Sequence, residues 1–247
     1  MTHSLPVTIP KIFAHRGASG TAPENTLAAI RRAHDLGATA IEFDVTVSRD
    51  GIAMLQHDYD VERCSNGSGP IILKDLEEIR TLDAGSWFGP EYTGEQIPTL
   101  EDTLKLAHQF GLFLNMEIKP CMGWEEPTAR AAARSLKQAW SDETPLLVSS
   151  MSELALQVFR EQMPDVPRGL ITHAIPENWQ ERLLRHECIS LHFNHAYATR
   201  DNVKALHDAG YKAMCFTVND PEIAQNLLDI GIDAIITNFP EKLLPLV

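Results

Sequence analysis

The sequence predicts an α/β fold: a closed (β/α)8 barrel of the TIM type with a small insertion after the hairpin at its second strand. Short β-rich runs alternate with amphipathic helical stretches along the 247 residues, an order that places parallel strands in one sheet. Eight such units favour closure of the sheet into a barrel. A chain of this length is typical of one barrel domain, so we expect 1–247 to form a single domain.

The predicted elements follow one another in regular order. Strands are expected at 11–15, 39–47, 112–118, 145–150, 167–172, 187–192, 212–218 and 233–237. Helices are expected at 24–36, 99–110, 126–140, 152–162, 176–185, 200–209 and 221–230, with a last turn after Pro240. Pro23-Glu24 and Pro221-Glu222 are helix-start signals. A doubly wound open sheet is the alternative, but no G-x-G-x-x-G motif follows the first strand.

Two features interrupt this alternation after the second strand. Asp50-Gly51 lies between two runs of alternating polarity, which indicates a β-hairpin. The following segment, 59–98, is rich in glycine, serine and polar residues and has one short helix expected near Lys74–Arg80. We expect 59–98 to be an insertion at the mouth of the barrel, where loops carry function in folds of this type.

The charge balance narrows the range of partners. The chain has 21 basic and 34 acidic residues, for a net charge of −13, which disfavours binding to nucleic acid or to an anionic membrane surface. The four cysteines form no C-x-x-C pair and are interpreted as reduced, small hydrophobic side chains. With neither an apolar leader nor a run of about 20 apolar residues, the protein is expected to be cytoplasmic, without stable membrane association.

Two carboxylates lie on one face of the second predicted strand. Glu42 and Asp44 are two residues apart, so the period of a strand points both side chains to the same side. Two neighbouring buried carboxylates repel each other, and a divalent cation would relieve that repulsion. The alternative is a polar strand face whose carboxylates pair with lysine or arginine.

The hairpin brings a histidine towards these carboxylates. A two-residue turn at Asp50-Gly51 would place Asp44 directly opposite His57, on the same face of the sheet. A three-residue turn with a bulge would shift the register by one residue. In either register His57 is expected near the carboxylates.

A third carboxylate is predicted on the next strand. Asn115, Glu117 and Lys119 alternate on one face near the end of that strand, which suits the mouth of a barrel better than its core. Three oxygen ligands favour Mg²⁺, with Ca²⁺ as the second choice, over Zn²⁺. The alternative for this strand is a simple surface pair between Glu117 and Lys119.

His15 and Arg16 end the first predicted strand and are expected at the same mouth. The Arg16 guanidinium has a geometry matched to phosphate, and Lys119 would add a second positive charge. Of the ten histidines, His15 and His57 are the two predicted at strand ends near the acidic cluster. Two imidazoles beside a cation suit phosphodiester cleavage, because one can accept the proton of the nucleophile while the other protonates the leaving alkoxide.

Short motifs recur in a fixed order along nearly the whole chain: His15-Arg16-Gly17, Pro23-Glu24-Asn25-Thr26, Ile41-Glu42-Phe43-Asp44-Val45, Asp50-Gly51, His57-Asp58, Glu117-Ile118-Lys119, Phe216-Thr217-Val218-Asn219 and Thr237-Asn238. Taken together, these motifs resemble the glycerophosphodiester phosphodiesterase family in its cytosolic bacterial form. The resemblance implies a barrel with an inserted segment at 59–98, metal ligands at Glu42, Asp44 and Glu117, and an acid/base pair at His15 and His57. It also implies phosphate contacts from Arg16 and Lys119. The implied reaction converts a small glycerophosphodiester and water into glycerol 3-phosphate and an alcohol, either directly or through a cyclic phosphate.

Four further positions are singled out by the same resemblance. Phe216 stands where an indole or phenol ring is frequent, and its ring would pack against the glycerol carbons. Asn238 stands where aspartate is frequent, and its role is left open. Glu24 and Asn25 are expected to brace the histidines, with the alternative that Glu24 only favours the first helical turn.

Two rival functions share this fold. One is a phosphodiesterase that acts on phospholipids at a membrane, and the other is a noncatalytic barrel that binds glycerophosphodiesters. A noncatalytic barrel would be expected to lack one of the two histidines or three carboxylates, whereas this sequence has all five. The preferred alcohol and the oligomeric state are left open.

Overall fold

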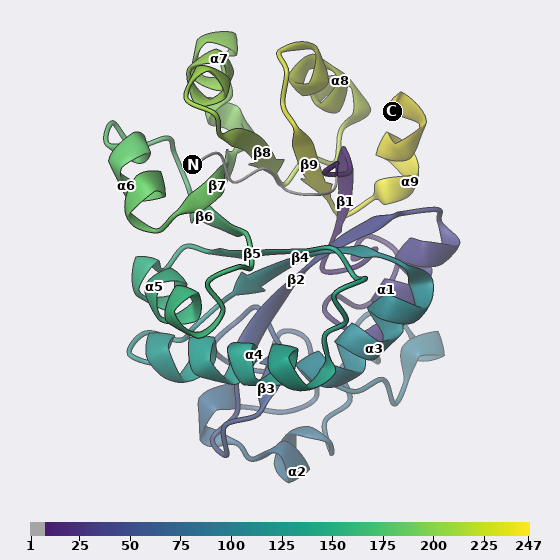
Figure 1. Ribbon diagram of the computed structural model, residues 1–247. Coiled ribbons are helices and arrows are strands. Elements are labelled where there is room, and N and C mark those ends of the chain that lie inside the picture. The colour runs from purple at the N-terminus through teal and green to yellow at the C-terminus, as the bar shows by residue number, and fades with distance from the viewer. Residues whose placement is uncertain (1–7) are drawn as a thin grey trace.

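The computed structural model describes residues 8–247, in which eight parallel strands close into a barrel surrounded by helices (Figure 1). The first strand pairs with both the second and the last, which closes the sheet. The predicted (β/α)8 barrel is therefore confirmed, with each strand within two residues of its predicted bounds. The barrel strands are β1 (Ile12–His15), β2 (Ala40–Val47), β4 (Phe113–Ile118), β5 (Leu146–Ser150), β6 (Arg168–Thr172), β7 (Cys188–Asn194), β8 (Lys212–Phe216) and β9 (Ala234–Thr237).

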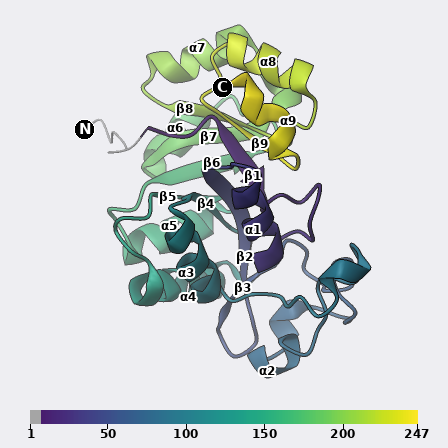
Figure 2. The same cartoon turned by 90° about the vertical axis from the view of Figure 1, so that its right-hand side faces the viewer.

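The helices lie outside the barrel, between successive strands (Figures 1 and 2). The helices between successive barrel strands bury one apolar face; α1, for example, buries Ala29, Ile30 and Ala33. Helix α2 differs, because it lies in the segment after the hairpin and buries Ile79 there. None of the helices within residues 8–247 has both the length and the apolar character needed to cross a membrane. The helices are α1 (Leu27–Asp35), α2 (Leu76–Ile79), α3 (Leu100–Phe110), α4 (Glu125–Ala139), α5 (Glu153–Gln162), α6 (Trp179–Arg185), α7 (Arg200–Asp208), α8 (Pro221–Asp229) and α9 (Pro240–Leu243).

One of the two helix-start signals is wrong. Helix α8 begins at Pro221 as predicted, but α1 begins at Leu27 and not near Pro23-Glu24. The reason is local: Asn25 has a φ of +55°, which a right-handed helix cannot include. Thr26 then caps the helix, because its side chain accepts a hydrogen bond from the backbone N–H of Ala29.

The hairpin after β2 has a three-residue turn, so the two-residue turn is wrong. Strand β3 (Ala53–Leu55) pairs antiparallel with β2, with Val47 opposite Ala53. Gly51 takes the left-handed conformation, with a φ of +82°, which is typical of the last position in a three-residue hairpin loop. The register therefore places Asp44 opposite Gln56, whose N–H donates to the Asp44 carbonyl, and His57 follows in the next position.

The segment after β3 contains little regular structure. Its short helix α2 confirms the helix expected near Lys74–Arg80, and two 3₁₀ turns, Ile71–Leu73 and Pro90–Tyr92, flank it. A small apolar cluster, to which β3 contributes Met54, holds the segment together. The cluster consists of Met54, Val61, Ile71, Ile79, Ala84 and Ile97.

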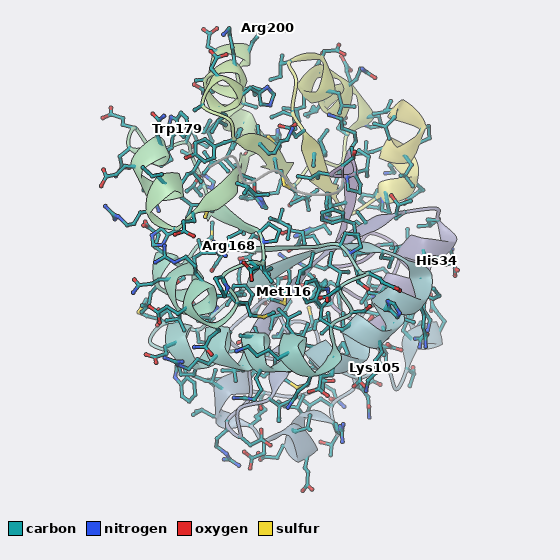
Figure 3. The ribbon with its side chains drawn as sticks, viewed as in Figure 1. His34, Lys105, Met116, Arg168, Trp179 and Arg200 are labelled. Carbon is teal, nitrogen blue, oxygen red and sulfur yellow. The ribbon has the colours of Figure 1, made fainter. Side chains whose placement is uncertain are left out.

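The barrel interior is apolar at the amino ends of the strands. Phe13 and Phe113 contact each other edge to face, with ring centroids 5.5 Å apart, and belong to a buried cluster with Leu147 and Met214. In Figure 3 the charged residues Lys105 and Arg200 lie at the periphery, whereas Met116 lies near the middle of the molecule. Polar groups at the other end of the barrel therefore stand on an apolar base, where electrostatic interactions are strong.

Candidate active site

A cavity of about 240 Å³ opens at the carboxyl ends of the barrel strands. Asp44, Glu24 and Asn25 do not line it, but each contacts Arg16, which does. A larger cavity, of about 500 Å³, lies at the amino ends of β4 to β6, but its lining contains no histidine. We therefore take the smaller cavity as the candidate active site. The predicted site residues that line the smaller cavity are His15, Arg16, Glu42, His57, Glu117, Lys119 and Phe216.

The structure brings the three predicted carboxylates together. Asp44 on β2 is the register partner of Glu117 on β4, and Glu42 lies two residues earlier on the same face of β2. All three are buried, and one oxygen from each can be chosen so that all lie within 4.8 Å of one another. This cluster could hold a metal ion.

Burial and mutual repulsion make the charged form of this cluster costly. Burial, and then the neighbouring carboxylates, raise the pKa of Glu42 well above its usual range. Burial, followed by the charge of Asp44, raises the pKa of Glu117 to about 7. A bound cation would remove this repulsion, so the donor set fits an oxygen-preferring divalent ion.

Two basic side chains also contact the cluster. The Arg16 Nε lies 3.1 Å from Asp44 Oδ2 as an ion pair, and Lys119 Nζ donates to Glu117 Oε1 at 3.0 Å. Burial opposes ionisation of Asp44, but Arg16, His57 and Lys119 outweigh it and lower the pKa of Asp44. The alternative of carboxylates paired with arginine and lysine is thus present in part. Among the described residues, Glu42 is left with only a backbone N–H, from Arg16 at 3.3 Å, and the His15 ring at 3.8 Å.

His15 is held by Asn238, whose role the sequence left open. The His15 Nδ1 lies 2.6 Å from the Asn238 Oδ1, so the ring donates its Nδ1–H to the amide oxygen. Burial, and then the charge of Arg16, lower the pKa of His15 to about 4. The neutral ring therefore presents the lone pair of Nε2, 3.8 Å from Glu42 Oε2. Closure of the barrel brings His15 and Asn238 together, because the residues directly before them, Ala14 and Thr237, are register partners in β1 and β9.

His57 is held by a different kind of partner. Its Nδ1 lies 2.6 Å from the carboxylate oxygen Oδ1 of Asp58, the next residue in the chain. A hydrogen bond from Arg63 lowers the pKa of Asp58 to about 2, against a smaller opposing effect of burial. Asp58 is therefore ionised beside the His57 ring at neutral pH.

The two residues expected to brace the histidines contact other groups instead. Glu24 accepts hydrogen bonds from the guanidinium groups of Arg16 and Arg63, each at 2.7 Å. The Asn25 side chain donates to Asp44 Oδ2 at 2.9 Å and accepts the Asp44 N–H at 3.1 Å. Glu24 thus positions Arg16, and Asn25 positions a carboxylate of the acidic cluster.

Sequence reasoning missed Arg63 and Asp58, which complete this network. Arg63 lies in the segment after β3 and bonds both Glu24 and Asp58, so it connects the surroundings of Arg16 to those of His57. The sequence position of Asp58, directly after His57, was the one available signal for its role. Arg63 had no such signal, because its segment has no periodic pattern.

Arg16 and Lys119 lie beside an acidic cluster that could hold a metal ion, at the carboxyl ends of the barrel strands. This arrangement places the chain among the TIM-barrel enzymes that act on phosphate esters. The chain belongs to the glycerophosphodiester phosphodiesterase family, because the model of the Glycerophosphoryl diester phosphodiesterase family matches residues 15–242. The resemblance recognised in the sequence and the expectation of a hydrolase are therefore confirmed.

Several relatives match almost from end to end. A glycerophosphodiester phosphodiesterase of Caldanaerobacter subterraneus is 35% identical over 237 residues, which cover 96% of this chain and 97% of that one. A phosphodiesterase of Oleispira antarctica, solved in complex with the product sn-glycerol-3-phosphate, is 42% identical with a TM-score of 0.94 and 96% coverage of both chains. A glycerophosphodiester phosphodiesterase of Agrobacterium tumefaciens is 27% identical with a TM-score of 0.79, covering 96% of this chain and 100% of that one.

Proposed function

We propose that this chain hydrolyses small glycerophosphodiesters, such as glycerophosphocholine or glycerophosphoethanolamine, to glycerol 3-phosphate and an alcohol. The observation that carries the proposal is the convergence of His15, His57 and two carboxylates of the acidic cluster, Glu42 and Glu117, on one cavity. The glycerol 3-phosphate bound to the Oleispira antarctica relative supports the same product here. The reaction uses a divalent cation and two-histidine acid/base catalysis.

The cation is Mg²⁺ in this proposal, with Ca²⁺ as the alternative. Glu42, Asp44 and Glu117 would hold it, because all three supply the hard oxygen ligands that these ions prefer. When bound, the cation withdraws charge from the non-bridging oxygens of the phosphate. The charge balance supports a divalent ion: three carboxylates face two basic side chains, so the cluster alone repels an anionic substrate.

Arg16 and Lys119 bind the phosphate. Both side chains line the cavity. Glu24 holds the Arg16 guanidinium and Glu117 holds the Lys119 ammonium. Each of these two groups has further N–H donors that can bind the phosphate. Phe216 supports the glycerol carbons from the opposite wall of the barrel. These residues orient the phosphorus atom between the two histidines.

The partners of the two rings assign their roles. A carboxylate partner stabilises an imidazolium, so His57 beside Asp58 donates the proton to the leaving alkoxide as the P–O bond breaks. The partner of His15 is a neutral amide, which favours a neutral ring with a free lone pair. His15 therefore accepts the proton of the nucleophile, which is either water or a hydroxyl of the glycerol.

We further propose that the chain 1–247 works as one barrel domain, with 59–98 as an insertion at its mouth. The contacts of Arg63 with Glu24 and Asp58 support this placement of the insertion, while residues 1–7 lie outside the described part of the chain. A cytoplasmic location is supported by four cysteines that are buried and free. The net charge of −13 supports a small-molecule substrate and disfavours nucleic acid and anionic membranes as partners.

The test is a coupled assay of glycerol 3-phosphate release, run over several head groups with and without a chelator. We expect release from glycerophosphocholine and glycerophosphoethanolamine that chelation abolishes and added Mg²⁺ restores. Full activity after exhaustive chelation would exclude the metal. Flotation with lipid vesicles, together with cleavage of phospholipid and not of soluble diesters, would favour the rival membrane enzyme instead.

A further inference from the structure

The catalytic cavity has a polar floor that the proposed chemistry does not use. Asn115 and His192 line this cavity, are almost completely buried, and come from different sides of the barrel, β4 and β7. Within residues 8–247, the Nδ2 of Asn115 and the Nδ1 of His192 have no hydrogen-bond partner. Two orphaned polar atoms in one cavity are costly unless something that enters the cavity pairs with them.

His192 is built into the wall as a neutral ring. Its Nε2 lies 2.9 Å from the Ser190 Oγ, and burial lowers its pKa to about 3. The neighbouring strand β6 leaves room for the ring: a Cβ at Gly169, the register partner of Ser190, would come within 2.5 Å of the His192 Nε2 and 2.6 Å of the Ser190 Oγ. With Nε2 committed to Ser190, the Nδ1 is the polar atom that His192 can offer to a ligand.

Asn115 offers a donor at the same depth. Its Oδ1 accepts a hydrogen bond from the Ser149 Oγ at 3.0 Å, which orients the amide and leaves the Nδ2 unpaired. Asn115 precedes Glu117 by two residues on β4, which displaces it by about 6.5 Å along the strand towards the barrel interior. A three-carbon chain anchored by its phosphate beside Glu117 has a reach of this order.

A hydroxyl group matches this pair better than an ion does. Asn115 offers N–H groups and needs an acceptor, while a neutral His192 offers a single nitrogen that donates or accepts according to its tautomer. One hydroxyl can accept from Asn115 and pair with His192 in either tautomer. A second carboxylate or phosphate would instead meet the negative field of the nearby Glu42, which is the register partner of Asn115.

We propose that Asn115 and His192 form a hydroxyl-binding floor that recognises the terminal hydroxyl of the glycerol moiety. This inference rests on the proposed function. The glycerol end is assigned to the floor because the floor is closed and can select a small group. The variable alcohol is directed outward, into a more open cavity of about 610 Å³ that shares His57 and Lys119 with the catalytic one.

The floor makes the free hydroxyl a condition for efficient cleavage. An acyl ester at that position has no hydroxyl proton to donate, and its chain would not fit beside the glycerol phosphate in a cavity of about 240 Å³. The enzyme is therefore selective for deacylated glycerophosphodiesters over lysophospholipids that carry an acyl chain on the terminal hydroxyl.

The experiment compares three substrates that share the choline head group. Glycerophosphocholine carries both hydroxyls, the 2-hydroxypropyl diester lacks the terminal hydroxyl, and the 3-hydroxypropyl diester lacks the secondary one. For the wild-type enzyme, we expect loss of the terminal hydroxyl to lower kcat/KM by about 10- to 100-fold, because it leaves two buried groups unpaired. Equal kcat/KM for glycerophosphocholine and the 2-hydroxypropyl diester would overturn the proposal. It would mean that water, and not the substrate hydroxyl, pairs with Asn115 and His192.

Variants then assign the selectivity to residues. In Asn115→Leu and in His192→Phe, we expect the preference for glycerophosphocholine over the 2-hydroxypropyl diester to shrink to a few-fold, while cleavage of the 2-hydroxypropyl diester is largely retained. The matched control is His207→Phe on the outer helix α7, which should keep the full preference. Equal losses on both substrates in the floor variants would mean a merely structural role and would contradict the proposal.

A binding measurement separates this inference from the proposed function. Calorimetric titration compares glycerol 3-phosphate with 1,2-propanediol phosphate, which lacks the terminal hydroxyl, on the wild-type protein and both floor variants. A preference for glycerol 3-phosphate that the variants lose supports the floor even if no diester is cleaved, which would refute the proposed function alone. Cleavage of diesters by a protein that binds both phosphates equally would refute the floor alone.

Discussion

At the scale of single residues, the acidic cluster is the most unbalanced part of the molecule. Glu42, Asp44 and Glu117 are all buried, yet within residues 8–247 only Asp44 and Glu117 have a lysine or arginine side chain within ion-pair distance. Glu42 has its pKa raised by burial and by the other two carboxylates. Of the three carboxylates, Glu42 would therefore be stabilised most by a bound cation, because no lysine or arginine of the described chain forms an ion pair with it.

The first prediction concerns that carboxylate. In Glu42→Gln we expect the concentration of Mg²⁺ needed for half-maximal activity to rise at least tenfold, because one charged ligand becomes a neutral one. The metal dependence of glycerophosphocholine hydrolysis measures the effect. Glu126→Gln is the matched control, since Glu126 forms an exposed ion pair with Arg130. An unchanged metal requirement in Glu42→Gln would contradict the ligand assignment.

The second prediction concerns the two histidines. We expect His15→Ala and His57→Ala each to lower kcat by about 10²- to 10⁴-fold, the usual contribution of a general acid or base. Circular dichroism and the melting temperature should stay near the wild-type values, because both rings lie at the edge of an open cavity and not in the apolar core. Near wild-type turnover in either variant would refute that residue's role.

Asn238 provides the third prediction, through its hydrogen bond to His15. We expect Asn238→Leu to lower kcat about tenfold, because the ring loses the acceptor that orients it. Asn238→Asp should retain activity but move the acidic limb of the pH–rate profile to higher pH, because a carboxylate stabilises the imidazolium and so raises the pKa of His15. Identical profiles for Asn238→Asp and the wild type would argue against His15 as the base.

At the scale of elements, the hairpin of β2 and β3 decides where His57 lies. Its three-residue turn ends at Gly51, whose φ of +82° is unfavourable for residues that carry a Cβ. The register set by this turn puts His57 just beyond β3, where Asp58 and not the sheet orients the ring. The position of His57, the proposed general acid, therefore depends on a turn at the other end of the hairpin.

The fourth prediction tests the conformation of that turn. We expect Gly51→Ala to lower the free energy of unfolding by about 1–2 kcal/mol, because alanine is strained in the left-handed region. There is room for the added methyl group, since the nearest atom to a Cβ at this position would be the Arg134 side chain at 3.6 Å. Gly51→Asn is the control, because asparagine tolerates this region and should recover part of the loss. Equal stability of wild type and Gly51→Ala in urea unfolding would count against the turn.

At the scale of the whole molecule, barrel closure buries polar groups that titrate only on unfolding. His192 is fully buried, and burial lowers its pKa from 6.5 to about 3. Between these two values the unfolded chain binds a proton that the folded protein does not. His192 therefore makes the folded state lose stability as the pH falls from about 6.5 towards 3, and it has no such effect at neutral pH.

The fifth prediction follows from that linkage. In His192→Phe we expect the free energy of unfolding to fall less steeply with pH between 6 and 4, by up to about 1.4 kcal/mol per pH unit, the effect of one proton. Urea unfolding at a series of pH values measures the slope. His207→Phe serves again as the control, since its ring is partly exposed and paired with Asp233. Parallel slopes for His192→Phe and wild type would mean that His192 is not kept neutral by the fold.

Most of the barrel could be predicted because its signals are local. Strand and helix periods, eight repeats and the Asp50-Gly51 turn motif depend on neighbouring residues, and the structure confirms the barrel they predict. The errors are local as well. The start of α1 depends on the positive φ of Asn25, and the register of the hairpin on whether two or three residues turn; neither is visible in a polarity pattern.

The sequence by itself determined the parallel barrel and the identity of the groups able to do chemistry: two histidines, three carboxylates, an arginine and a lysine. Periodicity fixes which face of a strand a residue occupies, and this was enough to place Glu42 beside Asp44. Only the tertiary structure decided the partners of those groups. Asn238 meets His15 across 223 positions of the chain, Arg63 reaches Glu24 across 39, and Asn115 and His192 share one cavity. Such contacts arise when a sheet closes on itself or when a long segment folds back over its mouth, because both bring together residues that no local pattern relates.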